Sequence, residues 1–150
     1  MNLMAFLVSH QVYFEFLKKR PTRHAQEASQ VSGVALNEIV KTLVFVDQDA
    51  KPVIVIVRGD CNVSRHKLEH CSNSKSVRLA SDEVAKTATG YPTGGIPPVG
   101  HKKKLPVFLD EGLMSYEYVW CGGGARSKLV RLRTEDIVKL SAATVCDIAT

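Results

Sequence analysis

The chain has 150 residues, of which 45% are hydrophobic and 23% charged, and its formal net charge is +5 at pH 7. These values are typical of an ordinary soluble globule, predict a single domain over residues 1–150, and exclude a strongly basic, histone-like chain. No apolar run reaches the roughly 18 residues that a membrane span needs, so no membrane partner is expected. The apolar residues 1–8 lack the charged region and cleavage site of a signal peptide, and we expect a cytoplasmic protein.

The first half of the chain predicts strands and helices from the spacing of its apolar residues. A strand over residues 12–17 comes first, followed by a helix that Thr22 can cap and that ends at Gly33. A short helical turn over residues 35–38 follows. Two buried strands are then expected over residues 39–46 and 52–57, joined by a hairpin loop. The second of these is continuously apolar, as in a strand that is covered on both faces.

The second half continues without a regular alternation of strands and helices. In chain order it predicts a helix capped by Ser64, a strand over 77–79, a helix capped by Ser81, strands over 106–109, 116–120 and 128–132, a helix over 134–140, and a last short strand over 143–145. This order indicates a mixed α/β (α+β) protein, with a mixed sheet or a partly closed β-barrel surrounded by helices.

The segment from Gly90 to Gly100 holds four glycines and three prolines in eleven residues, and it cannot form a helix or an interior strand. It predicts a rigid loop with free backbone N–H groups, which suits a phosphate or a developing oxyanion. The basic run Lys102–Lys104 follows His101 and suits a polyanionic partner. A tight surface turn with a solvated charge run is the alternative reading.

Lys41 lies inside an otherwise apolar predicted strand. Its burial costs desolvation free energy unless the ammonium reaches a partner or a cleft. It is therefore either a cation held in a pocket, where it binds a phosphate or polarises an ester, or a lysine on the solvent face of the strand. The triple glycine at positions 122–124 ends a strand and either serves as a turn or lets a ligand approach.

The four cysteines, at positions 61, 71, 121 and 146, contain no C-x-x-C pair and are expected to be free thiols. A disulfide between Cys61 and Cys71 is the alternative. His66 and His70 are four residues apart but lack the H-E-x-x-H pattern. No metal and no cofactor are expected, and the nucleophile-elbow, P-loop and dinucleotide motifs are missing.

Three segments together resemble the YbaK/ProX family of aminoacyl-tRNA deacylases, relatives of the bacterial prolyl-tRNA synthetase editing domain. They are Val40–Val44, Thr89–Tyr91 running into Gly94–Gly100, and Gly122–Gly124 with the strand that follows. The likeness covers residues 20 to 150. It implies a mixed α/β barrel with outer helices and a trans-editing hydrolase that removes the amino acid from a mischarged tRNA, of the Cys-tRNA(Pro) or Ala-tRNA(Pro) type.

The resemblance also implies roles for individual residues. The catalytic group would be Lys41, Gly94, Gly95 and Pro98. The substrate-binding group would be Tyr91, Ile96, Gly100, His101, Lys102, Gly122 and Gly123. The partners it implies are the aminoacylated acceptor end of a tRNA and prolyl-tRNA synthetase. An aminoacyl ester is already activated, so orientation and oxyanion stabilisation can replace a strong nucleophile.

Two departures from the family pattern keep other functions open. Residues 128–131 read Lys-Leu-Val-Arg where some of these deacylases carry an acidic residue, and residues 14–16 read Phe-Glu-Phe where some carry a tyrosine or histidine. A non-catalytic module that binds tRNA or a synthetase through the same loop is the first alternative. A small-anion or nucleotide binder that uses the glycine loop is the second.

Overall fold

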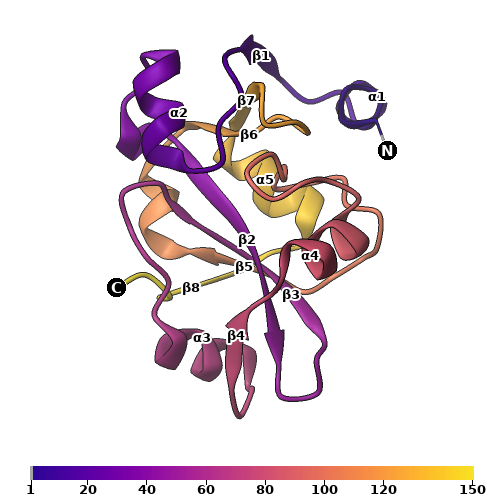
Figure 1. The fold of residues 1–150 in the computed structure, drawn as a ribbon, viewed down its shortest axis with the longest axis vertical. Helices are drawn as coiled ribbons and strands as arrows, with labels where there is room; N and C mark the ends of the chain where they lie inside the picture. The colour runs from indigo at the N-terminus through magenta and orange to yellow at the C-terminus, as the bar shows by residue number, and fades with distance from the viewer. Residues whose placement is uncertain (1) are drawn as a thin grey trace.

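A computed structural model describes residues 2–150 and contains two β-sheets with helices around them (Figure 1). The helices are α1 (Leu3–Ser9), α2 (Ala25–Ser32), η1 (Leu36–Glu38), α3 (Arg65–Ser72), α4 (Asp82–Thr89), η2 (Glu111–Ser115) and α5 (Thr134–Ser141). The strands are β1 (Glu15–Lys18), β2 (Val40–Asp47), β3 (Pro52–Arg58), β4 (Val77–Leu79), β5 (Val107–Asp110), β6 (Tyr118–Gly122), β7 (Lys128–Arg133) and β8 (Thr144–Cys146). No helix among these residues is long and apolar enough to cross a membrane.

The larger sheet has the strand order β4-β2-β3-β5-β8 and mixes antiparallel with parallel pairs. Its centre is β3, where residues 54–57 are fully buried. Ile54 and Ile56 pack into one core cluster, and Val55 and Val57 pack into another on the opposite face. The prediction of a strand covered on both faces is therefore confirmed, because alternate residues of a strand point to opposite faces.

The smaller sheet has the order β1-β7-β6 and is entirely antiparallel. Among residues 2–150, an isolated bridge joins Trp120 of this sheet to Ile39, the residue directly before β2. Val119 and Val130 from the small sheet share a core cluster with Val40 from the large one. The mixed α/β class is confirmed, but the described residues form two separate sheets instead of the expected partly closed barrel. The strands pair within each sheet and do not continue around a closed ring.

The N-terminal segment forms a helix, α1, that the sequence analysis left unassigned. Leu3 and Leu7 lie one turn apart on its buried face, and the Asn2 side chain caps it by accepting a hydrogen bond from the Ala5 N–H. Thr22 does not cap α2. Its hydroxyl accepts a hydrogen bond from the Lys19 Nζ at 2.8 Å, while α2 begins after His24 without a side-chain cap.

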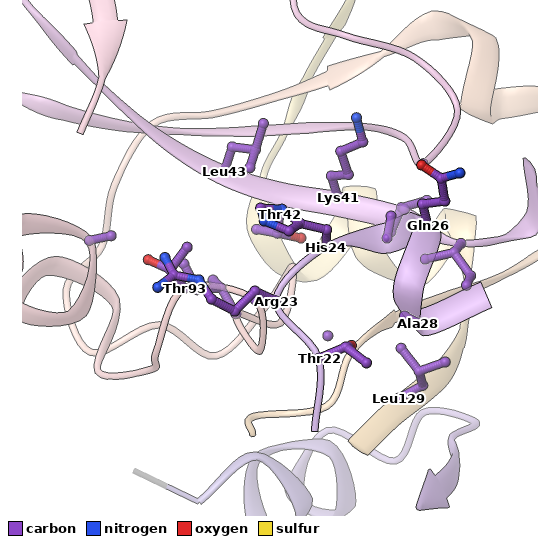
Figure 2. Close-up of a pocket in the computed structure, with 18 of the residues that line it drawn as sticks. Thr22, Arg23, His24, Gln26, Ala28, Lys41, Thr42, Leu43, Thr93 and Leu129 are labelled. Carbon is purple, nitrogen blue, oxygen red and sulfur yellow. The ribbon is translucent and has the colours of Figure 1, made fainter. Parts of the chain in front are cut away.

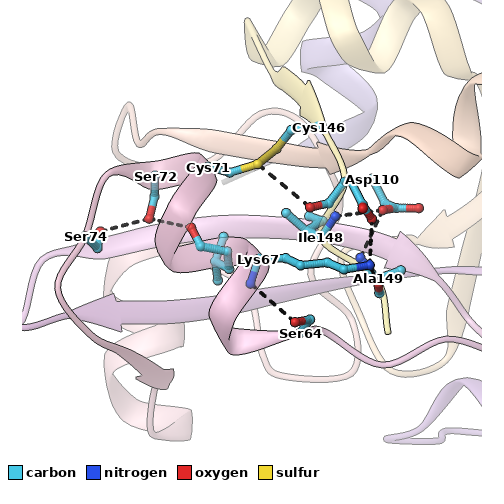
Figure 3. Close-up of a disulfide and its surroundings, with 11 residues drawn as sticks. Ser64, Lys67, Cys71, Ser72, Ser74, Asp110, Cys146, Ile148 and Ala149 are labelled. Carbon is cyan, nitrogen blue, oxygen red and sulfur yellow. Dashed lines mark hydrogen bonds and ion pairs between the residues drawn. A yellow bond between two sulfur atoms is a disulfide. The ribbon is translucent and has the colours of Figure 1, made fainter.

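Cys71 on α3 and Cys146 on β8 form a disulfide (Figure 3). The prediction of four free thiols is therefore wrong for this pair, and so is the alternative pair Cys61–Cys71. Cys61 and Cys121 are free. Proximity along the sequence misled here, since tertiary packing brings together two cysteines that are 75 residues apart.

The disulfide belongs to a region that we call the C-terminal corner, which comprises α3, Asp110 and residues 146–150 (Figure 3). The buried Asp110 carboxylate accepts hydrogen bonds from the N–H groups of Ile148 and Ala149, both at 3.0 Å. Its other oxygen accepts from the Gly112 N–H. Lys67 donates to the Asp147 carboxylate and to the Ala149 carbonyl. These bonds fix the end of the chain against the sheet.

Candidate functional site

One half of β2 forms an open edge of the larger sheet. The neighbouring strand β4 pairs only with Phe45–Asp47, and the last hydrogen bond on that side joins the Ala80 N–H to the Val44 carbonyl at 2.9 Å. From residue 40 to 44, this edge instead borders a cavity of about 530 Å³. The cavity is the candidate site because it combines backbone and charged groups in one concave space.

Five segments enclose the cavity (Figure 2). They are residues 22–26 before and in α2, residues 39–44 of β2, residues 59–62 after β3, residues 79–85 around the start of α4, and residues 93–96 of the glycine loop. Lys19, Ala28, Leu36, Gly122 and Leu129 complete the wall. The cavity therefore depends on parts of the chain that lie far apart in sequence.

Thr42 sits in the middle of the open edge and is only 8% exposed. Along an antiparallel strand, one residue directs both its N–H and its C=O to one side of the strand, and the next residue directs both to the opposite side. The Ile39 carbonyl and the Asp47 N–H bond toward β3, whereas the Val44 carbonyl bonds toward β4. By this alternation the N–H and C=O of Thr42 point away from β3, toward the side of β2 on which no strand ladder pairs with residues 40–44. The Thr42 hydroxyl is buried without a partner among residues 2–150.

Lys41 is half-buried and lines the cavity. Figure 2 shows its side chain and that of Leu43 leaving β2 on the same side. The ammonium donates a hydrogen bond to the Cys61 carbonyl at 2.6 Å. Cys61 belongs to the loop at residues 59–64, and this loop is attached to the C-terminal corner because the Thr150 N–H donates to the Asn62 carbonyl. The Lys41 ammonium is thus held in place by one hydrogen bond, and its other N–H groups are available to a ligand.

The glycine loop closes the opposite side of the cavity. Gly94 has φ +89°, and a Cβ there would lie 2.9 Å from the Arg23 backbone, so a side chain would obstruct the wall. The Gly95 N–H donates to the Pro92 carbonyl and is consumed within the loop. The N–H groups of Gly94 and Ile96 donate to no other described residue. Two backbone donors of this loop are therefore available to a ligand.

The structure brings only some of the predicted site residues to the cavity. Lys41, Gly94, Ile96 and Gly122 line it. Tyr91, Gly95, Pro98, Gly100, His101, Lys102 and Gly123 do not line it.

His101 and Tyr91, which do not line the cavity, support the glycine loop from outside the cavity. The His101 Nε2–H donates to the Pro97 carbonyl at 2.6 Å, and burial lowers the pKa of this imidazole. Tyr91 is buried in the core beneath the loop, where burial raises the pKa of its phenol. Lys102, Lys103 and Lys104 are exposed beyond it.

Basic side chains outside the predicted site surround the cavity mouth. Arg23 pairs with Asp82 at 2.8 Å and lowers the pKa of that carboxyl. The Arg126 Nε donates to the Thr93 carbonyl, and the Lys19 Nζ donates to the Arg126 carbonyl. Burial lowers the pKa of Lys19. The cluster of basic residues at 18–23 was the available signal, but only the fold places it beside the glycine loop.

Residues 19–140 match the family model of the aminoacyl-tRNA editing domain. The chain belongs to this family. Within it, the chain is of the YbaK/ProX type, which is related to the editing domain of prolyl-tRNA synthetase. The matched range includes every segment that lines the cavity.

Several relatives of this editing domain are known. The "Putative Cys-tRNA(Pro)/Cys-tRNA(Cys) deacylase EbsC" of Enterococcus faecalis is 28% identical, over 99% of this chain and 93% of that protein. A proline–tRNA ligase of Geobacter metallireducens is 34% identical over 69% of this chain, which corresponds to only 18% of the ligase. Among solved structures, a hypothetical protein superposes with TM-score 0.90 and 29% identity, covering 99% of both chains. A "putative trans-editing enzyme for prolyl tRNA synthetase" gives TM-score 0.81 and 33% identity over 91% of this chain and 87% of that one.

Proposed function

We propose that the protein is a trans-editing deacylase that hydrolyses the ester of a mischarged aminoacyl-tRNA, with Cys-tRNA(Pro) or Ala-tRNA(Pro) as the type substrates. The observation that supports this most directly is the pairing of a positioned ammonium, Lys41, with the unbonded amides of Gly94 and Ile96 around one cavity. Residues 1–150 would act as one editing domain in the cytoplasm, where tRNAs are charged.

The chemistry follows from this geometry. Water adds to the ester carbonyl carbon, and negative charge develops on the carbonyl oxygen. Backbone N–H donors and a nearby cation in the cavity stabilise that charge. The tetrahedral intermediate then releases the ribose oxygen, which takes up a proton. The products are the free amino acid and a tRNA with a free terminal hydroxyl.

The surroundings of the cavity suit the tRNA end. Arg23, Lys19 and Arg126 lie at or near its mouth and would contact terminal phosphates, while Lys102–Lys104 would contact the acceptor stem. Gly95, Pro98, Gly100 and Gly123 would shape the loop that carries the donors. Prolyl-tRNA synthetase is the partner that we propose, because related domains occur inside proline–tRNA ligases.

The test is a deacylation panel over tRNAs charged with different amino acids, run with wild type and Lys41→Ala. We expect release of a small amino acid by wild type and a loss of roughly 100-fold or more in kcat/KM for Lys41→Ala, typical of a lost transition-state contact. Lys51→Ala, on an exposed turn, is the matched control. A folded Lys41→Ala protein that keeps the full rate would show that Lys41 has another role.

The alternative is a binding module without turnover. It is favoured by residues 128–131, which read Lys-Leu-Val-Arg where some of these deacylases carry an acidic residue. In that case no charged tRNA of the panel would be hydrolysed, while tRNA binding would weaken steeply with salt.

A further inference from the structure

The peptide groups of Thr42 lie on the stretch of β2 that no strand ladder covers. Buried backbone N–H and C=O groups are almost always paired, and strand edges are normally covered or blocked. Thr42 is nine-tenths buried and lines the cavity, and its N–H and C=O point away from β3, toward the side of β2 where no strand ladder pairs with residues 40–44. A donor and an acceptor of one residue are therefore directed side by side toward the uncovered stretch of this strand.

We propose that the aminoacyl group of the substrate docks on Thr42 as if it were one residue of an added antiparallel strand. Its α-ammonium donates to the Thr42 carbonyl, and the Thr42 N–H donates to the ester carbonyl oxygen. These are the two hydrogen bonds that directly opposite residues form with each other in a hydrogen-bonded pair of antiparallel strands. The proposal rests on the deacylase function and names the element of the site that holds the reacting group.

Position within the cavity favours the aminoacyl group over a nucleobase at this edge. A base also offers a donor beside an acceptor. However, Thr42 adjoins Lys41 in β2 and shares the cavity with the free amides of Gly94 and Ile96. A base bound here would occupy the space between these groups and leave them without the ester. The aminoacyl carbonyl instead places the reacting carbon in the cavity that these groups line, and Thr42 supplies one more donor to the developing oxyanion.

This docking also fixes where the substrate side chain lies. Directly opposite residues of an antiparallel pair place their side chains on the same face of the sheet. The amino-acid side chain would therefore lie on the Thr42 face, beside Val44, Ala85 and Ile96, which are buried, line the cavity and share one core cluster. This wall is apolar, and its alanine leaves room for a short side chain such as that of alanine or cysteine. A D-amino acid would direct its side chain toward the other face, which carries Lys41 and Leu43.

Because a backbone group cannot be removed by side-chain substitution, the experiment changes the substrate. Alanyl-tRNA is compared with propionyl-tRNA, which lacks only the α-ammonium, and each enzymatic rate is divided by the spontaneous hydrolysis rate of the same ester. We expect the normalised kcat/KM to be at least tenfold lower for the propionyl ester, the size of a lost charge-assisted hydrogen bond. Equal normalised values would overturn the docking while leaving the deacylase function intact.

A binding measurement separates the two proposals. The 3′-alanylamino and 3′-propionylamino derivatives of 3′-deoxyadenosine are stable amides, and calorimetry should give a Kd at least tenfold lower for the alanyl compound. If the panel shows no hydrolysis but this ratio holds, the deacylase function fails and the docking of the aminoacyl group stands. If the two affinities are equal, the docking fails.

The side-chain subsite is tested by filling it. Ala85→Leu should reduce kcat/KM for alanyl-tRNA at least tenfold, while Val84→Leu, at an exposed position of the same helix, should leave it unchanged. L-alanyl-tRNA should be hydrolysed at least tenfold faster than D-alanyl-tRNA. Full activity of a folded Ala85→Leu protein, or equal rates for the two enantiomers, would overturn the placement of the side chain.

Discussion

The C-terminal corner and the open edge of β2 satisfy their polar groups in opposite ways. In the corner, the Asp110 carboxylate accepts three backbone N–H groups, Lys67 bonds twice, and a disulfide joins α3 to β8. At the edge, no strand ladder covers the peptide groups of Thr42 on the side away from β3, and the amides of Gly94 and Ile96 donate to no other described residue. Unpaired buried groups cost free energy, and at the edge of β2 a bound ligand can offset that cost.

The two regions are connected through the loop at residues 59–64. The Cys61 carbonyl holds the Lys41 ammonium, while the Ser64 N–H donates to the Ile148 carbonyl. The C-terminal corner, whose polar groups are hydrogen-bonded, thus supports the wall of the cavity. From this comparison we expect changes in the corner to lower stability without changing the rate of the folded protein, and changes at the cavity to alter the rate.

The largest effect on stability is expected from removal of the disulfide. In the double variant Cys71→Ala/Cys146→Ala, the unfolded chain loses a cross-link between residues 75 apart, which corresponds to about 4 kcal/mol of unfolding free energy. Urea unfolding measures it, and Cys61→Ser is the control at a free cysteine. The deacylation rate of the folded double variant should equal that of wild type, and a parallel loss of rate would break the contrast between the two regions.

Gly122→Ala should affect both stability and rate. A Cβ at this position would overlap the Ile96 carbonyl oxygen and lie 2.9 Å from the Gly95 backbone carbon, so the glycine loop must shift. We expect a loss of about 3 kcal/mol and of most activity. Gly33→Ala meets no atom within 4 Å and should cost only about 1 kcal/mol, for its positive φ, with activity retained. An active, stable Gly122→Ala protein would show that the loop adapts.

Asp110→Ala tests the C-terminal corner by a smaller loss of stability than removal of the disulfide. Three backbone N–H groups lose their acceptor, and we expect a loss of about 2 kcal/mol in a denaturant titration, with a wild-type rate. Asp49→Ala, on an exposed turn, should be nearly neutral. A selective fall in kcat for Asp110→Ala would mean that the corner also tunes Lys41.

The smallest effect concerns pH. Burial lowers the pKa of His101 below its usual value of 6.5, so the folded protein favours the neutral imidazole. The unfolded chain then binds the proton first, and this contribution to stability is present above pH 6.5 and lost as the pH falls below it. His101→Gln retains an N–H donor for Pro97 and should lose less stability between pH 7.5 and 5.5. Identical profiles of melting temperature for the two proteins would contradict this assignment.

The parts of the fold that could be read from sequence are those fixed by local chemistry. Ser64 and Ser81 cap α3 and α4 through hydrogen bonds to the N–H groups of Lys67 and Val84, and Gly33 ends α2 in the left-handed conformation. The uninterrupted apolar run of β3 identified the centre of the larger sheet. Lys41 stood out because a cation in an apolar strand demands a partner.

Other features depended on which segments meet in space. A disulfide partner 75 residues away, the arrangement as two sheets, and the place of Arg23 at the cavity mouth have no local signal. The glycine loop was visible in the sequence, but the use of the Gly95 N–H inside its own turn was not. Membership of the editing-domain family could be predicted from the sequence, because its motifs are short and local.

The sequence by itself determined the caps of α3 and α4, the buried strand β3 and the presence of the glycine loop, because each depends on the conformational preferences of neighbouring residues. Only the tertiary structure decided that β4 pairs with the last residues of β2 and leaves Thr42 uncovered. Strand register is a long-range property, and a backbone group carries no side-chain identity by which a sequence could reveal that it lacks a partner.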